Sequence, residues 1–360
     1  MNKHIDLYEY GLTEKIKQEY EAMECHGYLG RVTAQYTNIY RVVTEKAEVI
    51  AEVSGKLNFN AHSLTDYPAV GDWVILDRDQ NDSGDAIIQS IIPRFSLFSR
   101  QVSGKKSDEQ AVAANINTIF ICMAFGHDYN LRRLERYLSI AYSSGAVPVI
   151  VLTKSDLCDD VETKVLDVQN IAFGVEVLIV SSLTQVGLDN IKAHIHPTKT
   201  IAFIGSSGVG KSTLINLLCG EERLKTRDVR KDERGRHTTS HRELIKLPEG
   251  GIVIDTPGMR ELQIHSADLQ TSFSDIEELS KSCHFSNCSH ENEPDCAVKL
   301  AIEEGRLDEE RLLSYKKLNK ELEYDQDRAV LHPKQLEKKK IIKMMGSLDA
   351  QKKMKDKKHR

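Results

Sequence analysis

The pattern of apolar and polar positions changes its period along the chain, and these changes divide the chain into regions. Apolar residues within 1–26 stand at loose helical spacing, which predicts a short helical lead-in. Turn signals such as Ser54-Gly55 then separate five short stretches rich in β-branched and aromatic residues, at 27–36, 39–44, 47–54, 70–77 and 86–92. Five short strands in succession predict a small β-barrel of the OB or SH3 type.

From about residue 115 near-continuous apolar runs alternate with helical segments. The segment 131–144 is amphipathic and is followed by Gly145, which predicts a helix with a glycine at its end. Five apolar runs each lead into a polar, glycine-rich or Asp-containing loop, at 116–125, 148–156, 176–182, 200–208 and 250–258. This alternation predicts a parallel sheet covered on both faces, whose ligands bind beyond the carboxyl ends of its strands.

After Gly258 no further strand is predicted. A Cys/His-rich stretch over 283–296 precedes helical segments and a basic tail over 334–360. The tail holds 11 Lys/Arg and 3 Asp/Glu, a local charge of +8, so with a net charge of −5 the rest of the chain carries −13. Such a tail is either a solvated or disordered chain end, or an arm that binds a polyanion such as nucleic acid.

Length and composition define the broad class. A chain of 360 residues, 40% hydrophobic and 29% charged, fits two or three globular domains and excludes a collagen-like or fully disordered chain. No apolar run approaches the ~18 residues of a membrane helix, and the charged start lacks the apolar core of a secretory signal. Four of the seven cysteines are scattered, which favours a reducing cytoplasm over a disulfide framework: Cys25, Cys122, Cys158 and Cys219.

The strongest motif is GSSGVGKST at 205–213, which matches G-x-x-x-x-G-K-[ST] between a predicted strand and a predicted helix. Its glycines let backbone N–H groups converge on phosphates, and the helix N-terminus adds partial positive charge. We expect Lys211 to reach the β- and γ-phosphates and Ser212 to be a magnesium ligand. The candidate phosphate-binding residues are Gly205, Ser206, Ser207, Gly208, Val209, Gly210, Lys211, Ser212 and Thr213.

The motif TKSD at 153–156 also follows a predicted strand. It resembles the [NT]-K-x-D motif of guanine-nucleotide-binding proteins. A carboxylate suits guanine because it accepts hydrogen bonds from both N1–H and the 2-amino group, donors that adenine lacks there. Lys154 is expected to lie along the base, and two serines stand where these proteins have a second base-contacting loop. The candidate base-contacting residues are Thr153, Lys154, Ser155, Asp156, Ser181 and Ser182.

The order of the motifs differs from that in ordinary GTPases. DTPG at 255–258 supplies Asp255, which can hold magnesium through water, and Gly258, whose N–H can bind the γ-phosphate. TKSD comes before the P-loop here, whereas the P-loop comes first in ordinary GTPases. Circular permutation moves the chain ends and keeps the strands in space, so we interpret this region as a circularly permuted GTPase. Its chain leaves directly after Gly258.

A metal site is predicted by the pattern C-x4-C-x-H-x5-C within a polar loop. Three thiolates and one imidazole suit one tetrahedral zinc, and four protein ligands leave no open position, so the role is structural. The alternative is reduced thiols that cluster without metal. His284 is a poorer ligand candidate than His290 because it adjoins the first cysteine. The candidate zinc ligands are Cys283, Cys288, His290 and Cys296.

Taken together, these motifs resemble the ribosome small-subunit-dependent GTPase A family of bacterial ribosome assembly. The resemblance covers roughly 27–330 and includes ANINTIF, NLRRLERYL, TKSD, the P-loop, GRHTTSHREL, DTPGMREL and the CHFSNCSH cluster. It implies a zinc domain directly after the DTPG loop, and GTP hydrolysis on the small ribosomal subunit. Thr153 stands where the family commonly has Asn, and the lead-in and tail are not clear family signatures.

No glutamine stands close after DTPG to orient the attacking water, and Met259 occupies the nearest such position. The segment 235–239, GRHTT, lies where the first switch loop belongs. Thr238 or Thr239 is expected to complete the magnesium shell. His237 is the titratable group best suited to position water, and the resemblance implies that catalytic role. The alternative for His237 is an RNA contact or a position on a mobile loop.

We therefore expect a multidomain α/β protein: a helical lead-in, an OB-type β-barrel, a circularly permuted P-loop GTPase domain with a parallel sheet, a zinc-binding helical domain and a basic tail, at 1–26, 27–98, 99–262, 263–333 and 334–360. We expect a cytoplasmic monomer without membrane contact. We expect it to use GTP, Mg²⁺ and one structural Zn²⁺, and to bind the small (30S) ribosomal subunit and its rRNA. The alternatives are an RNA-binding module with structural nucleotide, and an ATPase with an accidental TKSD.

Overall fold

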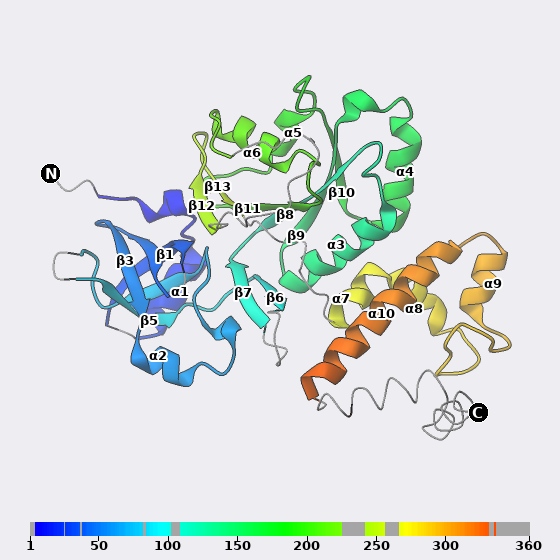
Figure 1. Cartoon of the computed structure of the whole chain (residues 1–360), viewed down its shortest axis with the longest axis horizontal. Coiled ribbons are helices and arrows are strands. Elements are labelled where there is room, and N and C mark those ends of the chain that lie inside the picture. The colour runs from blue at the N-terminus through cyan, green and yellow to red at the C-terminus, as the bar shows by residue number, and fades with distance from the viewer. Residues whose placement is uncertain are drawn as a thin grey trace, which may run out of the picture. The chain divides into compact units, whose positions relative to one another are not determined.

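The computed structural model describes residues 4–24, 26–36, 38–81, 84–101, 109–224, 242–255, 266–330 and 335. The chain forms two compact units, one of 1–101 and 109–274 and one of 102–108 and 275–360 (Figure 1). Within the described part of the chain, no helix has both the length and the apolar character needed to cross a membrane.

The first five strands close into the predicted barrel. They are β1 (Tyr28–Gln35), β2 (Tyr40–Thr44), β3 (Glu48–Val53), β4 (Trp73–Leu76) and β5 (Ala86–Ile91). Their order is β1-β2-β3-β5-β4, and β4 pairs back onto β1. The pair β3–β5 is parallel and the other pairs are antiparallel, which is the OB arrangement. The barrel interior is filled by Val32, Tyr40, Val42, Val49, Ala51, Val74, Leu76, Ala86 and Ile88.

The lead-in packs on the barrel. It contains the 3-10 turn η1 (Leu7–Tyr10) and the helix α1 (Glu14–Ala22). Leu7, Leu12 and Ile16 are buried with side chains of β2, β4 and the end of β5. The lead-in is therefore part of the first unit's core.

One predicted turn is a helix start. Ser54 precedes α2 (Gly55–Asn60), and its hydroxyl accepts a hydrogen bond from Leu57 N at 3.1 Å. Serine favours such N-cap positions because its oxygen satisfies a backbone donor of the first turn. The turn expected at Ser54-Gly55 is thus wrong. The 3-10 turn η2 (Leu64–Asp66) follows before β4.

The predicted parallel sheet is present. Its strands β8 (Thr118–Ala124), β9 (Val147–Thr153), β10 (Glu176–Val180), β11 (Thr200–Gly205) and β13 (Ile252–Asp255) lie in the order β10-β9-β8-β11-β13, and all neighbours are parallel. The P-loop strand β11 therefore lies between β8 and β13, although the base-motif strand β9 comes earlier in the chain. This is the permuted arrangement that the motif order predicts.

Three strands were not predicted. β12 (Arg242–Lys246) runs antiparallel to β13 and, on its other side, to β1, where Glu243 lies opposite Ala34. The barrel and the parallel strands are consequently joined in one 11-stranded sheet. The pair β6 (Leu97–Gln101) and β7 (Glu109–Ala114) forms a separate two-stranded sheet.

Helices cover both faces of the parallel strands. Alternate residues of these strands share a core with α5 (Leu188–Lys192) and α6 (Lys211–Cys219). α3 (Leu131–Ser144) packs on β8 and β9, and neighbours α4 (Val161–Ile171) and α7 (Ser266–Ser272). α3 ends as predicted at Gly145, whose φ of 82° is the left-handed conformation that suits glycine.

Arg31 of β1 ties three parts of the first unit together. The side chain is buried, and its guanidinium donates to the carbonyls of Tyr10 and Gly71 and, at 2.8 Å, to Thr200 Oγ1. The guanidinium also lies 5.3 Å from the centre of the Trp73 ring. Burial lowers the pKa of Arg31 to about 9. Since Thr200 begins β11, the lead-in and the barrel are fastened to the strand that leads into the P-loop.

The second unit is helical, as predicted. α9 (Ala297–Glu303) and α10 (Glu309–Val330) follow α8 (Ser274–Ser280). Arg311 of α10 is buried and donates two hydrogen bonds, both 2.8 Å long, to the carboxylate of Asp275. Tyr315 donates to Glu277 Oε1 at 2.6 Å. These contacts join α10 to α8 beside the Cys/His loop.

Candidate nucleotide site and metal centre

The P-loop follows β11 and turns directly into α6. Lys211 donates from Nζ to the carbonyls of Gly205 and Ser206, at 2.8 and 2.6 Å, so its ammonium is held inside the loop. Gly205 has a φ of 143°, and a Cβ there would lie 2.3 Å from the carbonyl oxygen of Cys122. Only glycine fits so close to the neighbouring strand. The loop thus begins at a position that requires glycine and encloses the lysine ammonium, as expected of a phosphate-binding loop.

Thr153 links the base motif to the P-loop. Its side chain is buried, and its hydroxyl donates to the carbonyl of Val209 at 2.6 Å. Threonine at this position therefore supplies a donor to the P-loop. The hydrogen bond fixes the spacing between the two loops that would hold the base and the phosphates.

Asp156 and Ser181 meet at the ends of adjacent strands. Ser181 Oγ donates to Asp156 Oδ1 and accepts from Thr184 N at 3.2 Å. The turn that presents the carboxylate begins at Lys154, whose φ of 59° is left-handed. Asp156 lies in η3 (Ser155–Leu157), and Ser182 follows Ser181 in the β10 loop. The two predicted base-contacting loops are therefore joined by a hydrogen bond.

Asp255 ends β13 on the other side of the P-loop. Burial raises the pKa of its carboxyl, and the Lys211 ammonium partly offsets that rise. A half-buried carboxylate under the influence of a lysine suits a site that a divalent cation would share with phosphates. Ser212 stands in the first turn of α6, and Thr213 follows it. The remaining candidates Gly258, His237, Thr238 and Thr239 lie outside the described residues.

The four predicted zinc ligands come together in the second unit. Their ligand atoms all lie within 4.8 Å of one another: Cys283, Cys288, His290 and Cys296. His290 Nδ1 lies 3.7 Å from Cys283 Sγ and 3.4 Å from Cys296 Sγ, and these two sulfurs are 3.9 Å apart. His284 is not part of the cluster, and its ring packs edge-on against Phe285. The donors fit one tetrahedral metal ion.

Ser280 determines which nitrogen of His290 faces the cluster. Ser280 Oγ lies 2.7 Å from the carbonyl of Ile276 and 3.1 Å from His290 Nε2. Its proton goes to the carbonyl, so it accepts from Nε2–H and leaves the lone pair of Nδ1 for a metal. Burial lowers the pKa of His290, with the Lys316 ammonium acting in the same direction. Both effects keep the imidazole neutral, as a metal ligand must be.

Cys296 is placed at the start of α9. Burial opposes its ionisation, but hydrogen bonds from the backbone of Lys299 and Val298 and from the side chains of Cys288 and Cys283 together outweigh burial, and the pKa of the Cys296 thiol is lowered. A thiolate at a helix N-terminus is stabilised by the same donors that cap the helix. The lowered pKa favours the thiolate form of Cys296, which is the form that binds a metal cation.

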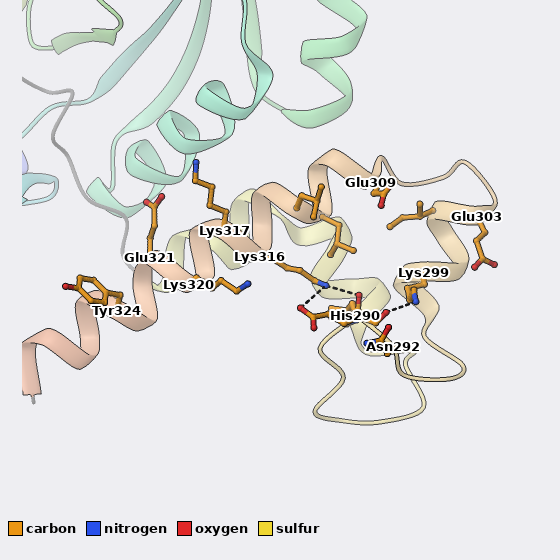
Figure 2. Close-up of a pocket in the computed structure, with 14 residues that line it drawn as sticks. His290, Asn292, Lys299, Glu303, Glu309, Lys316, Lys317, Lys320, Glu321 and Tyr324 are labelled. Atoms are coloured by element: carbon orange, nitrogen blue, oxygen red, sulfur yellow. Dashed lines mark hydrogen bonds and ion pairs between the residues drawn. The ribbon is translucent and has the colours of Figure 1, made fainter. Parts of the chain in front are cut away.

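Lysines of α9 and α10 hold the Cys/His loop against these two helices. Lys316 Nζ donates to the carbonyl of His290 at 2.8 Å, and Lys299 Nζ donates to that of Glu291 at 2.6 Å (Figure 2). The same helices line a groove of about 1020 Å³ with an apolar floor that includes Ile302 and Leu312. Two of its lysines therefore position the metal loop, and the groove wall is tied to the metal centre.

The metal centre gives a first prediction. Purified protein is expected to carry one zinc per chain by metal analysis, because all four positions of a tetrahedral ion are filled. Stripping the metal is expected to loosen the second unit and leave GTP binding by the first unit largely intact. Ser280→Ala removes the hydrogen bond that orients His290, so zinc affinity is expected to fall about 10–100-fold in chelator competition.

Ser289→Ala is the matched control, because Ser289 pairs with Glu293 and not with a candidate ligand. Freshly purified, reduced protein without zinc would contradict the metal site. Equal zinc affinity in Ser280→Ala and Ser289→Ala would contradict the role of Ser280. The sequence had not singled out Ser280, because a serine ten residues before a histidine carries no motif.

Comparisons with known proteins agree with this geometry. A family model described as RsgA GTPase matches residues 91–265. The chain is 47% identical over 357 residues to the small ribosomal subunit biogenesis GTPase RsgA 2 of Lactiplantibacillus plantarum, covering 99% of each chain. It is 42% identical over 337 residues to the RsgA protein of Methanosarcina acetivorans, covering 93% of this chain and 90% of that one.

Two solved structures share the architecture. YjeQ from Thermotoga maritima has 26% identity and a TM-score of 0.60, over 82% of this chain and 98% of its own. YloQ, described as a circularly permuted GTPase, has 28% identity and a TM-score of 0.59, over 85% of this chain and 98% of its own. With a relative 47% identical over nearly its whole length, this chain belongs to the RsgA GTPase family.

Proposed function

We propose that this protein hydrolyses GTP to GDP and phosphate during late assembly of the small ribosomal subunit, and that the subunit stimulates the reaction. The observation that carries the proposal is that the P-loop, the base motif and Asp255 follow strands of one parallel sheet, with Thr153 bonded to the P-loop and the Lys211 ammonium acting on the pKa of Asp255. Relatives at 47% and 42% identity are named for small ribosomal subunit biogenesis. The site and the names support the same function.

The chain's residues suit a magnesium ion bound with GTP. Ser212 in the first turn of α6 and the half-buried Asp255 would hold it, with Thr238 or Thr239 completing the shell. Magnesium neutralises charge on the phosphates. Lys211 adds a fixed positive charge from within the P-loop, and Asp156 selects guanine over adenine.

Water activation is assigned to His237. Many GTPases use a glutamine after the D-x-x-G motif, and this chain has Met259 there. His237 lies in the segment between α6 and β12, where a switch loop belongs. Without a glutamine, turnover of the free protein should be slow.

The sheet offers a route by which the subunit can act on that segment. β12 begins at Arg242, directly after the segment that contains His237, and pairs with β1 of the barrel. Glu243 of β12 forms an ion pair with Arg41 of β2. An rRNA surface bound to the barrel would thus be one strand away from the catalytic segment.

We assign the remaining parts to subunit contact. Three parts would contact the subunit and its rRNA: the barrel domain (27–98), the zinc domain (263–333) and the basic tail (334–360). The two other parts are the lead-in (1–26) and the permuted GTPase domain (99–262). The tail lies outside the described residues apart from Gln335. Assembly of ribosomal subunits would place the protein in the cytoplasm, and we expect it to act as a monomer.

Nucleotide state should control subunit affinity. Because the chain enters the zinc domain soon after Asp255–Gly258, loss of the γ-phosphate is expected to release that connection. Protein with a non-hydrolysable GTP analogue should therefore cosediment with small subunits more tightly than protein with GDP. By linkage, the subunit must favour the GTP analogue over GDP by the same factor. Equal subunit affinity of the two forms would contradict this proposal.

A further inference from the structure

A chain of polar contacts connects the start of α3 to the P-loop. Asn130 caps α3, with its Oδ1 accepting from Arg133 N at 2.9 Å, and its own N–H donates to Met123 Sδ at 3.2 Å in β8. β8 pairs with β11 so that Cys122 lies opposite Gly205. The first turn of α3 is thereby fixed beside the first residues of the P-loop.

Arg133 spans the gap between these elements. Its Nη1 donates both to Asp128 Oδ1, in the turn after β8, and to the hydroxyl of Ser206 in the P-loop. The carbonyl of the same Ser206 accepts from Lys211 Nζ at 2.6 Å. A chain of hydrogen bonds therefore runs from Asp128 through Arg133 and Ser206 to Lys211, the lysine assigned to the phosphates.

The fold alone does not account for an arginine at this position. A cation in the first turn of a helix meets the positive end of the helix dipole, which disfavours it. The cap of α3 is already made by Asn130, and the Arg133 side chain does not contribute to it. Asp128 compensates the charge and points the guanidinium at Ser206. The remaining interaction of the Arg133 side chain is its hydrogen bond to Ser206 of the P-loop.

We propose that Arg133 is a positioning residue for GTP hydrolysis. By holding the Ser206 hydroxyl, it fixes the peptide whose carbonyl keeps the Lys211 ammonium aimed at the bound phosphates. Charge on the transferred phosphoryl group is redistributed in the transition state, so a displaced lysine costs more in hydrolysis than in binding. The inference rests on the proposed function through the assignment of Lys211.

The test compares Arg133→Met, Ser206→Ala and the double variant. Single-turnover GTP hydrolysis is measured with and without small subunits, and GDP affinity by titration with a fluorescent GDP analogue. Each single variant is expected to lower the hydrolysis rate about tenfold or more, and in Arg133→Met the GDP affinity should change by less than about threefold. The double variant should be no slower than the slower single variant, because both changes break one contact. Arg133→Lys should recover part of the rate.

Lys192→Met is the matched control. Lys192 is ion-paired with Glu249 at 2.8 Å, and its side chain is 39% exposed, against 35% for Arg133. The control should keep the parent hydrolysis rate. Thermal unfolding identifies a variant that is merely destabilised.

Three results would overturn the inference. They are parent rates in Arg133→Met, rate losses that multiply in the double variant, and parallel losses of hydrolysis, GDP affinity and melting temperature. Lys211→Ala separates this inference from the proposed function. If Lys211→Ala still hydrolyses GTP, the proposed site fails. If Lys211→Ala is inactive and Arg133→Met is normal, only the role of Arg133 fails.

Discussion

Replacing Asp156 with asparagine is expected to weaken GTP binding by about 1–3 kcal/mol or more, because guanine donors lose their acceptor and meet an amide donor. The same change should improve the binding of xanthosine triphosphate, whose 2-oxo group needs a donor. Asparagine keeps an oxygen that can accept from Ser181, so the joined loops should survive the substitution. Equilibrium titration with the two nucleotides measures both effects.

Asp189→Asn is the matched control for this substitution. Asp189 is an exposed carboxylate in the first turn of α5, outside the base motif. The Asp189→Asn substitution should leave the preference for GTP over xanthosine triphosphate unchanged. An Asp156→Asn protein that still prefers GTP to xanthosine triphosphate would show that the base is read elsewhere. A chain that binds ATP as well as GTP before any substitution would favour the ATPase alternative.

Replacing His237 with alanine is expected to slow the stimulated reaction strongly while sparing binding. General acid–base groups contribute roughly 10²–10⁴-fold, so single-turnover hydrolysis on the subunit should fall within that range. GTP affinity and subunit cosedimentation should stay near the parent values, and the complex with GTP should accumulate. A lower hydrolysis rate with unchanged subunit affinity indicates a catalytic histidine. A histidine that contacts RNA would instead lower subunit affinity when replaced.

His196→Ala provides the control for this second substitution. His196 is exposed in the connection that leads into β11. Its replacement should not change hydrolysis. Normal stimulated turnover in His237→Ala would rule out the assigned role and move the search to groups that the subunit supplies.

Local sequence signals account for much of the fold. The five barrel strands and the five parallel strands were predicted because their apolar residues stand in short, bounded runs. The helix 131–144 was predicted with its end because Gly145 terminates it. In these elements burial follows the local order of apolar and polar residues, so the sequence pattern reports them directly.

Elements that depend on distant partners were missed. β12 has only five residues, and its pairing with β1 joins Glu243 to a strand more than 200 residues earlier. Arg31 looks like an ordinary strand residue until Tyr10, Gly71 and Thr200 surround it. No local period encodes such contacts, so they come only from the structure.

The residues of the candidate site also fall into those with a local sequence signal and those without one. The P-loop, TKSD and zinc ligands carry spacing motifs that their chemistry requires. Ser280 contacts the zinc ligand His290 through one hydrogen bond, and Arg133 contacts Ser206 of the P-loop through another. Neither sequence separation follows a motif. Arg133 lies in the segment NLRRLERYL that carries the family resemblance, but Arg132 shares its helix turn and its charge, so neither signal singles out Arg133.

The most direct test of the account is the rate of GTP hydrolysis by the full chain with and without purified small ribosomal subunits. The protein alone should turn over slowly, because no glutamine follows DTPG. Saturating small subunits should raise the rate by more than about tenfold, and large subunits should not. A rate that small subunits leave unchanged, although they bind the protein, would contradict the account and favour an RNA-binding module with structural nucleotide.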